Sequence, residues 1–185
     1  MQRKLSIMLA AAVAMTVIAI PATADEPTIV STVVGSDDFD ILEEAVKYAG
    51  LAGALNNVTV FAPTDKAFVK LAEDLGASDL SESAVIDFLV ALDTAAPGTI
   101  ATVLRYHVAA GRLFSGDVVG DGEVTSVLDG ATFDVFAPGK AVRSIQLVDH
   151  DPDARNPKFV KGAIDIEVSN GVIHVIDRVL RPADL

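Results

Sequence analysis

The 185-residue sequence contains no cysteine, and it has 14 basic residues against 26 acidic ones. Without cysteine the protein cannot form disulfides, so its stability must come from a packed core and from hydrogen bonds. The same absence excludes lipid attachment at a lipoprotein-type leader, a thiolate metal site and a cysteine nucleophile. A chain of this length is typical of one domain with a substantial core.

Basic residues are scarcest in the body of the chain. Arg3 and Lys4 lie in an N-terminal leader that has no acidic residue, which leaves 12 basic and 26 acidic residues and a net charge of −14 for the remainder. Such a surface repels phosphate backbones, so we expect no nucleic-acid partner. An acidic surface also keeps a domain soluble, which is its simpler interpretation.

Motifs of the common enzyme classes are also missing. The sequence has no Gly-x-Ser-x-Gly elbow, no His-Glu-x-x-His pair and no phosphate loop, and Gly120-Asp121-Gly122 lacks the later glycine of a dinucleotide fingerprint. We therefore expect no catalytic residues, no cofactor and no metal centre. A pair of carboxylates suited to glycoside hydrolysis stays open, because its spacing is a three-dimensional quantity.

Residues 1–24 have the pattern of a secretory signal peptide. A basic start precedes an almost wholly apolar run over residues 5–20, and Ala22-Thr23-Ala24 provides a small-residue cleavage site. The apolar run is shorter than the ~20 residues that a membrane-spanning helix needs. We expect cleavage after residue 24, a single domain over residues 25–185, no membrane span after cleavage, and a periplasmic or extracellular location.

The N-terminal half has apolar residues at three- and four-residue spacing, which predicts amphipathic helices. The expected helices cover residues 39–51 after a Ser36-Asp37-Asp38 cap, residues 81–92 and residues 99–105. Residues 28–34, rich in threonine and valine, predict a first strand or an extended arm. Residues 58–62 predict a buried strand that turns at Pro63 into a helix, with Thr64 as its N-cap and Asp65 in its first turn.

The C-terminal half contains short segments rich in valine and isoleucine, separated by Gly, Pro, Asn or Asp, as is typical of antiparallel strands. A strand region is expected to start at Tyr106-His107-Val108. The further expected strands are residues 123–128, 131–136, 141–148, 158–168 and 172–177. Helices followed by strands indicate an α+β domain rather than alternating βαβ units.

Asn170-Gly171 lies between two strand-like runs and predicts a hairpin with a type I′ turn, which requires positive φ at both residues. In the first run, Asp165 and Glu167 alternate with apolar residues and are expected to face water. The second run, residues 172–176, is apolar on both faces and is expected to be a central strand. It contains His174.

The imidazole of His174 is interpreted as a neutral structural group whose nitrogens bind nearby backbone or hydroxyl groups. The functional alternative is a metal ligand or a general base, but no second ligand lies at helix or strand spacing from it. His107, next to Tyr106, is open to the same two interpretations. Packing is the commoner role of such a pair.

The segment Asp149-His150-Asp151-Pro152-Asp153 is polar and predicts a solvated loop. Its alternating aspartates suggest a calcium site, but the EF-hand pattern would need glycine at position 154 and glutamate at position 160, where the chain has Ala154 and Val160. Whether this loop binds a cation weakly stays open.

Together, three of these segments resemble a fasciclin (FAS1) domain, over residues 28–182: the run from Thr59 to Phe68, the Tyr106-His107 pair and the run from Ser169 to Pro182. The resemblance implies a wedge of two mostly antiparallel β-sheets with the N-terminal helices grouped on one side. It also assigns structural roles to motif positions, which are Thr59, Phe61, Pro63, Thr64, Asp65, Asn170, Gly171, His174 and Asp177.

The resemblance also suggests candidate binding residues. Tyr106-His107 matches a motif associated with adhesion in some animal fasciclin proteins, and Asp165-Ile166 matches a pair that some of them present to integrins. The residues beside Asp165-Ile166, including Glu167, depart from those longer motifs, so integrin binding is not carried over to this chain.

Two functions are therefore considered. The first is a secreted, non-catalytic binding module that contacts a protein or glycan at a cell surface or in a matrix. The second is a small periplasmic ligand-handling protein or hydrolase that uses His107 or His174 with nearby carboxylates. Clustering of a histidine with aspartates in an open pocket would favour the second function, and burial of both histidines against backbone partners would exclude it.

Overall fold

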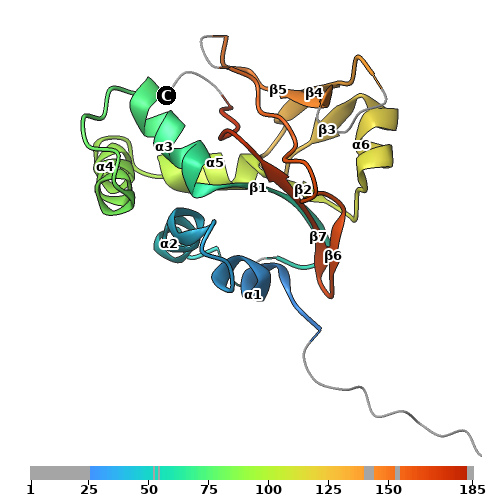
Figure 1. The fold of residues 1–185 in the computed structure, drawn as a ribbon, viewed down its shortest axis with the longest axis horizontal. Helices are drawn as coiled ribbons and strands as arrows, with labels where there is room; N and C mark the ends of the chain where they lie inside the picture. Colours follow the sequence, from blue (N-terminus) through green and yellow to red (C-terminus); the bar gives the residue numbers. More distant parts are fainter. Residues whose placement is uncertain (1–25, 52, 54, 140–143, 153–154, 183–185) are drawn as a thin grey trace, which may run out of the picture.

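A computed structural model describes residues 26–51, 53, 55–139, 144–152 and 155–182 (Figure 1). The expected signal peptide and residues 141–143 of one expected strand lie outside this part of the chain. The described residues form six helices and seven strands in two sheets, which confirms the predicted α+β class. The helices are α1 (Ile29–Val34), α2 (Asp40–Tyr48), α3 (Asp65–Asp74), α4 (Glu82–Ala95), α5 (Thr99–Tyr106) and α6 (Ser115–Asp121).

Helix α1 corrects the prediction of a strand or extended arm over residues 28–34. Thr28 and Ser31 form a capping box, in which the Ser31 amide donates to Thr28 Oγ1 at 3.1 Å and the Thr28 amide donates to Ser31 Oγ at 2.8 Å. These bonds satisfy amides at the helix start and outweigh the weak strand preference of Val and Thr. Helices α2, α4 and α5 confirm the periodicity, whereas α6 has no counterpart among the sequence predictions.

The first sheet has the strand order β2-β1-β7-β6 and the second β3-β4-β5. Their bounds are β1 (Val58–Pro63), β2 (Val108–Ala110), β3 (Glu123–Thr125), β4 (Thr132–Phe136), β5 (Gln146–Val148), β6 (Ile166–Val168) and β7 (Gly171–Ile176). Neighbouring strands are antiparallel except β1 and β7, which run parallel. The strand expected over residues 158–168 is reduced to β6 and two isolated bridges, at Lys158 and Phe159.

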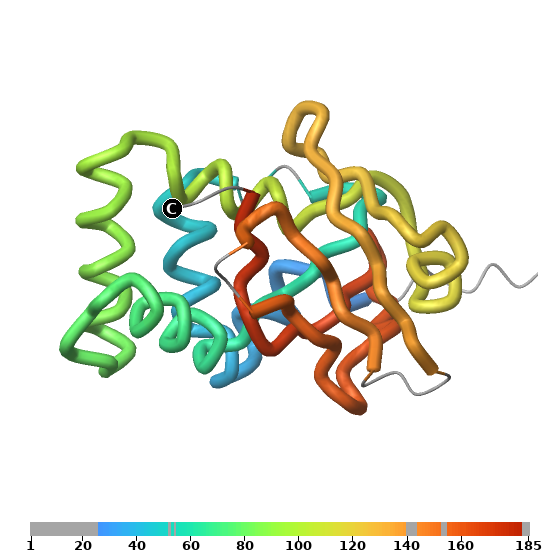
Figure 2. Tube along the Cα trace, turned by 90° about the horizontal axis from the view of Figure 1, so that it is seen from above, coloured from blue at the N-terminus to red at the C-terminus, as the bar shows by residue number. Residues whose placement is uncertain are grey.

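Strand β7 is central in its sheet, as predicted, and all six of its residues are buried. Its neighbour β1 is also buried throughout, and the two strands separate two apolar cores. Val60 and Ala62 of β1 face the core beneath helices α1 to α5, whereas Phe61 faces the core under the second sheet. Strand side chains alternate between faces, so one strand serves both cores. Figure 2 shows helices α3 and α4, in green, at one end of the molecule, and strands β3 and β4 with helix α6, in yellow to orange, toward the other end.

The hairpin between β6 and β7 is present, but its turn differs from the prediction. Val168 pairs with Gly171, so the loop consists of Ser169 and Asn170, and neither Asn170 nor Gly171 has a positive φ. The type I′ prediction is therefore wrong. The Asn170 side chain instead joins two other segments, because its Oδ1 accepts from the Ile29 amide at 2.8 Å and its Nδ2 donates to the Leu55 carbonyl at 2.7 Å.

The helix caps also differ from those expected. Ser36-Asp37-Asp38 does not cap α2, whose N-cap is Phe39. The cap comes from Asp65, far along the chain, whose carboxylate accepts from the Ile41 amide at 2.9 Å and the Asp40 amide at 3.3 Å. Thr64 is the N-cap residue of α3 by position, but its side chain makes no capping bond. At α2, a tertiary contact from Asp65 therefore takes the place of the expected local cap.

No single helix within the described ranges is both long and apolar enough to cross a membrane. Helices α4 and α5 pass that test only as a pair, and they are bent by 110° relative to each other.

Candidate functional site

The Tyr106-His107 pair lies at the end of α5, and both side chains are internal. Tyr106 is fully buried, its hydroxyl donates to the Thr132 carbonyl at 2.7 Å, and its ring meets Phe133 edge to face. Burial raises the pKa of Tyr106 well above its usual range. This placement argues against the prediction that the pair contacts a partner, because neither side chain reaches the surface.

His107 is held in one tautomer by two backbone groups. Its Nε2 accepts from the Leu180 amide at 2.9 Å, so the ring proton is on Nδ1, which donates to the Val103 carbonyl at 2.7 Å. Burial lowers the pKa of His107 to about 4, and the ring is neutral at pH 7. Both nitrogens are used, so neither is available to a substrate or a metal.

His174 has the same kind of environment on β7. The Asp165 amide donates to Nδ1 at 3.2 Å, so Nε2 carries the proton and donates to the Leu113 carbonyl at 2.8 Å. The ring is fully buried and stacks on Phe159, with centroids 5.0 Å apart. Burial lowers the pKa of His174 as well. The ring thus connects the central strand β7 to Leu113, which precedes α6, and to Asp165, which precedes β6.

Asp165 and Ile166 are integrated into the fold rather than displayed. Asp165 has a φ of 55°, and its carboxylate accepts from the Ser115 amide and hydroxyl, each at 2.6 Å. These bonds hold the start of α6. The Asp165 side chain is 34% exposed, so the prediction that it faces water is met only in part. Ile166 is half-buried at the start of β6, opposite Ile173.

The other motif positions also bond to backbone groups. Thr59 Oγ1 donates to the Gly111 carbonyl and accepts from the Leu113 amide, both at 2.8 Å. Asp177 Oδ1 accepts from the Lys158 amide at 2.8 Å. Phe61 packs edge to face on Phe133, and Pro63 ends the buried strand β1.

The loop that starts at Asp149 contains buried charges, which corrects the prediction of a solvated turn. Asp151 forms an ion pair with Arg181, with Oδ2 and Nε 2.7 Å apart and both side chains almost wholly buried. Asp149 Oδ2 accepts from the Arg181 amide at 2.8 Å, whereas its buried Oδ1 has no hydrogen-bond partner among the described residues. Burial raises the pKa of Asp149. His150 is exposed, and Asp153 lies outside the described residues.

A cation site does not follow from this loop. Within the described part of the chain, no group of three or more histidine or acidic side chains is arranged to hold a metal ion. The acidic residues of the loop that the structure describes are instead directed to Arg181.

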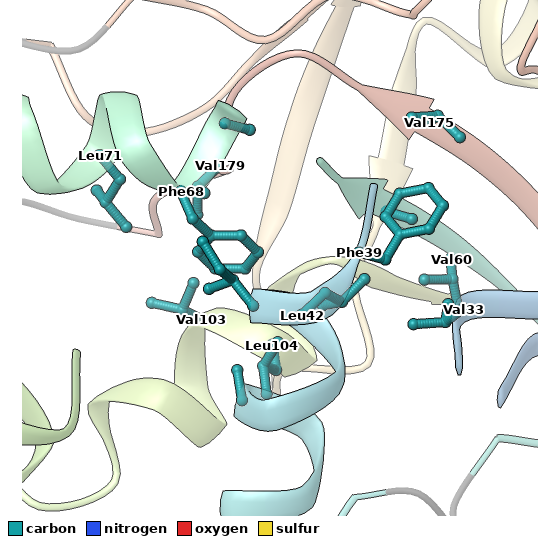
Figure 3. Packing of buried hydrophobic residues seen from close by; sticks show 14 of the residues in the cluster. Val33, Phe39, Leu42, Val60, Phe68, Leu71, Val103, Leu104, Val175 and Val179 are labelled. Carbon is teal, nitrogen blue, oxygen red and sulfur yellow. The ribbon is translucent and has the colours of Figure 1, made fainter. Parts of the chain in front are cut away.

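An apolar cavity of about 480 Å³ lies between the first two helices and the first sheet. Its walls come from α1, α2, the segment that precedes β1, β1 itself, and the junction of α5 and β2. Figure 3 labels four of the lining residues, Val33, Leu42, Val60 and Leu104. These four are buried, which makes the interior of the cavity a hydrocarbon surface.

The mouth of the cavity has a different composition. Val34 and Val127 line it and are 52% and 41% exposed. Lys47 also lines it, but this ammonium pairs with Glu43 and Glu44, and the pairing raises the pKa of Lys47. Arg105 is exposed, and its guanidinium has no ion-pair partner among the residues that the structure describes.

Sequence reasoning did not find this cavity. Most of its lining residues are Val, Leu and Ile positions that predict ordinary helix and strand cores, and pattern alone cannot distinguish a filled core from a hollow one. Phe61, Pro63 and His107 of the sequence motifs also line it. The only sequence signal is the valine-rich stretch of α1, which was interpreted as a strand.

A family model for the fasciclin domain matches residues 37–182 of the chain. Protein sll1483 of Synechocystis sp. is 32% identical over 165 residues, which cover 87% of this chain and 77% of that protein. The uncharacterized protein sll1735 of the same organism is 30% identical over 167 residues, which cover 83% of this chain and 97% of that one.

Longer proteins are also similar over part of their length. The transforming growth factor-beta-induced protein ig-h3 of Sus scrofa is 32% identical over 158 residues, which are 84% of this chain but 19% of ig-h3. Among solved structures, a FAS1 domain pair from the insect cell adhesion molecule Fasciclin I aligns with a TM-score of 0.43 and 17% identity, covering 82% of this chain and 43% of that one.

Proposed function

The chain belongs to the fasciclin domain family, and on this premise we propose that it is an exported, non-catalytic binding module that acts at a cell surface or in a matrix. The main support for a non-catalytic function is the environment of His107 and His174. Each uses both ring nitrogens on backbone groups inside the protein. A general base needs a free nitrogen within reach of a substrate proton.

The alternative, a periplasmic hydrolase, has little support. Of the three histidines, His150 is the exposed one, and among the residues that the structure describes it has no hydrogen bond to a carboxylate side chain. The carboxyl group closest to a histidine is that of Asp165, 3.9 Å from the buried His174 and already bound to Ser115. The large cavity is walled by hydrocarbon, which suits binding rather than proton transfer.

Export and partner class are part of the same proposal. The leader pattern in residues 1–24 suits an exported domain, and the family resemblance suggests a protein or glycan as the partner. The acidic surface makes binding to anionic polymers unfavourable and a neutral or basic partner preferable.

The test is a screen of the chain from residue 25 to residue 185 against arrays of matrix proteins and glycans, run beside a hydrolase substrate library. We expect at least one saturable hit on the arrays and no turnover in the library. Immunodetection in cell fractions of a producing strain tests export separately. Turnover that disappears in His107→Gln or His174→Gln while the fold persists would overturn the non-catalytic assignment.

A further inference from the structure

The apolar cavity is too large to be a packing defect. Protein interiors pack as densely as organic crystals and contain few voids larger than a water molecule. A cavity of about 480 Å³ therefore leaves part of the apolar surface of its lining residues without packing partners. An apolar molecule that filled it would restore those contacts, whereas water would find almost no polar partner there.

The volume sets the size of such a molecule. An engineered protein cavity of about 150 Å³ lined by apolar side chains takes up benzene, which has six carbon atoms. At the same packing, the cavity beneath β1 holds a molecule of about 19 non-hydrogen atoms. Its volume also falls in the range of ~300–1,000 Å³ that is usual for small-molecule sites.

The charged residues at the mouth of the cavity indicate which polar group a bound molecule carries at its exposed end. Lys47 pairs with Glu43 and Glu44, so among the described residues that line the mouth Arg105 is the cation without an ion pair. A guanidinium matches a carboxylate in shape and binds it with two parallel hydrogen bonds. A ligand with its apolar chain inside the cavity would pack against the apolar wall, and its anionic end would pair with the guanidinium of Arg105.

We propose that the cavity between α1, α2 and β1 binds a single-chain carboxylic acid of fatty-acid size, with the chain inside and the carboxylate at Arg105. This inference goes beyond the surface-binding function and does not depend on it. The apolar leader, residues 5–20, is not a suitable occupant, because as a helix it would be about 24 Å long and ~10 Å wide. The chain from residue 25 to residue 185 lacks it in any case.

The direct measurement is calorimetric titration of residues 25–185, extracted with organic solvent to remove bound lipid, with hexadecanoate below its micellar concentration. Hexadecanol is the uncharged comparison, and octanoate is the short-chain comparison. We expect one saturable site for hexadecanoate, weaker binding of hexadecanol by about fivefold, and weaker binding of octanoate by more than about tenfold.

Variants separate the two parts of the site. Val33→Phe and Val60→Phe add bulk to the cavity wall and should weaken hexadecanoate binding by about tenfold or more, whereas Val119→Phe on the exposed face of α6 makes the same change elsewhere. Arg105→Gln should weaken hexadecanoate by about fivefold and leave hexadecanol unchanged. Lys66→Gln removes an exposed charge on α3 and is its control.

Three results would overturn the proposal. The first is the absence of saturable hexadecanoate binding to the wild-type chain. The second is unchanged binding in a Val60→Phe or Val33→Phe protein that unfolds cooperatively. The third is equal binding of hexadecanoate to Arg105→Gln and wild type, which would refute the carboxylate position even if a chain enters the cavity. Arg105 is exposed, so its variant stays informative even if both phenylalanine variants fail to fold. A negative array screen would leave these results unaffected.

Discussion

Gly171 of β7 lies so close to Val58 of β1 that a Cβ atom on it could not be accommodated. That atom would lie far inside the van der Waals contact distance of the Val58 carbonyl oxygen and 2.7 Å from Ile29 Cδ1. The two residues are also partners in the parallel β1–β7 pair. Glycine is required here by the close approach of two backbones and of α1, not by a positive φ.

Gly171→Ala is therefore expected to destabilise the protein by about 3 kcal/mol, because a backbone oxygen cannot move aside as a flexible side chain could. The measurement is the free energy of unfolding in urea. Gly116→Ala is the matched control: it lies in α6, has no neighbour within 4 Å of a Cβ atom and has no positive φ, so it should be neutral or slightly stabilising. Equal stability of the two variants would contradict the close-approach account.

His174→Ala is expected to cost about 1–3 kcal/mol, because the Asp165 amide and the Leu113 carbonyl lose their partner. Chemical denaturation gives the value, and His150→Ala, at an exposed position, is expected to change it little. An unchanged denaturation midpoint for His174→Ala would mean that the ring has no structural role.

His107 should make the stability depend on pH in a defined direction. Its pKa is lowered from 6.5 to about 4 in the folded protein, so between these values the unfolded chain takes up a proton that the folded chain does not. The stability that the neutral ring contributes is present above pH 6.5 and is lost as the pH falls toward 4, by about 3 kcal/mol in total.

The measurement is the difference in unfolding free energy between wild type and His107→Gln at pH 7 and at pH 4. That difference should shrink by about 3 kcal/mol at the lower pH, since the buried carboxyl groups titrate alike in both proteins and cancel. His150→Gln should show no such change. A difference independent of pH would mean that His107 is protonated in the folded state as readily as in the unfolded one.

Asp65→Ala should remove the cap of α2 and cost about 1–2 kcal/mol. Asp87→Ala removes the same charge from an exposed position on α4 and should be neutral or slightly stabilising, because alanine favours helix. Hydrogen exchange of the Ile41 amide provides a local readout, and protection that persists in Asp65→Ala would disprove the capping contact.

Arg181→Ala should cost about 3–5 kcal/mol, because it removes the cation that forms an ion pair with the buried carboxylate of Asp151. Arg178→Ala breaks the more exposed pair with Asp74 and should cost less than about 1 kcal/mol. Thermal unfolding of both variants compares the two arginines directly. Similar costs would indicate that the Arg181 pair is solvated.

Local pattern was sufficient for the fold class and for most elements. Three-residue spacing identified α2, α4 and α5, and the doubly apolar run identified β7 as central. Local pattern did not predict contacts between side chains and backbone groups that are far apart in the sequence. The α2 cap comes from Asp65, and the start of α6 is held by Asp165, so the neighbouring residues carry no signal of either contact. The capping box of α1 is local, but the valines beside it suggested a strand.

The candidate site was predicted less well. The fasciclin resemblance directed attention to Tyr106, His107, Asp165 and Ile166, and the fold buries or anchors all four. The motif residues Phe61, Pro63 and His107 line the cavity, but no motif indicates a hollow there, because a void is defined by what surrounding elements fail to fill.

The sequence by itself determined the absence of cross-links, the acidic charge, the family and the order of helices and strands, since these depend on composition and on contacts between near neighbours. Only the tertiary structure decided that the histidines are internal, that Gly171 serves a close approach, and that a hollow remains beneath β1. Each of these depends on distances between residues that are far apart in the chain, and such distances are set by packing rather than by local preference.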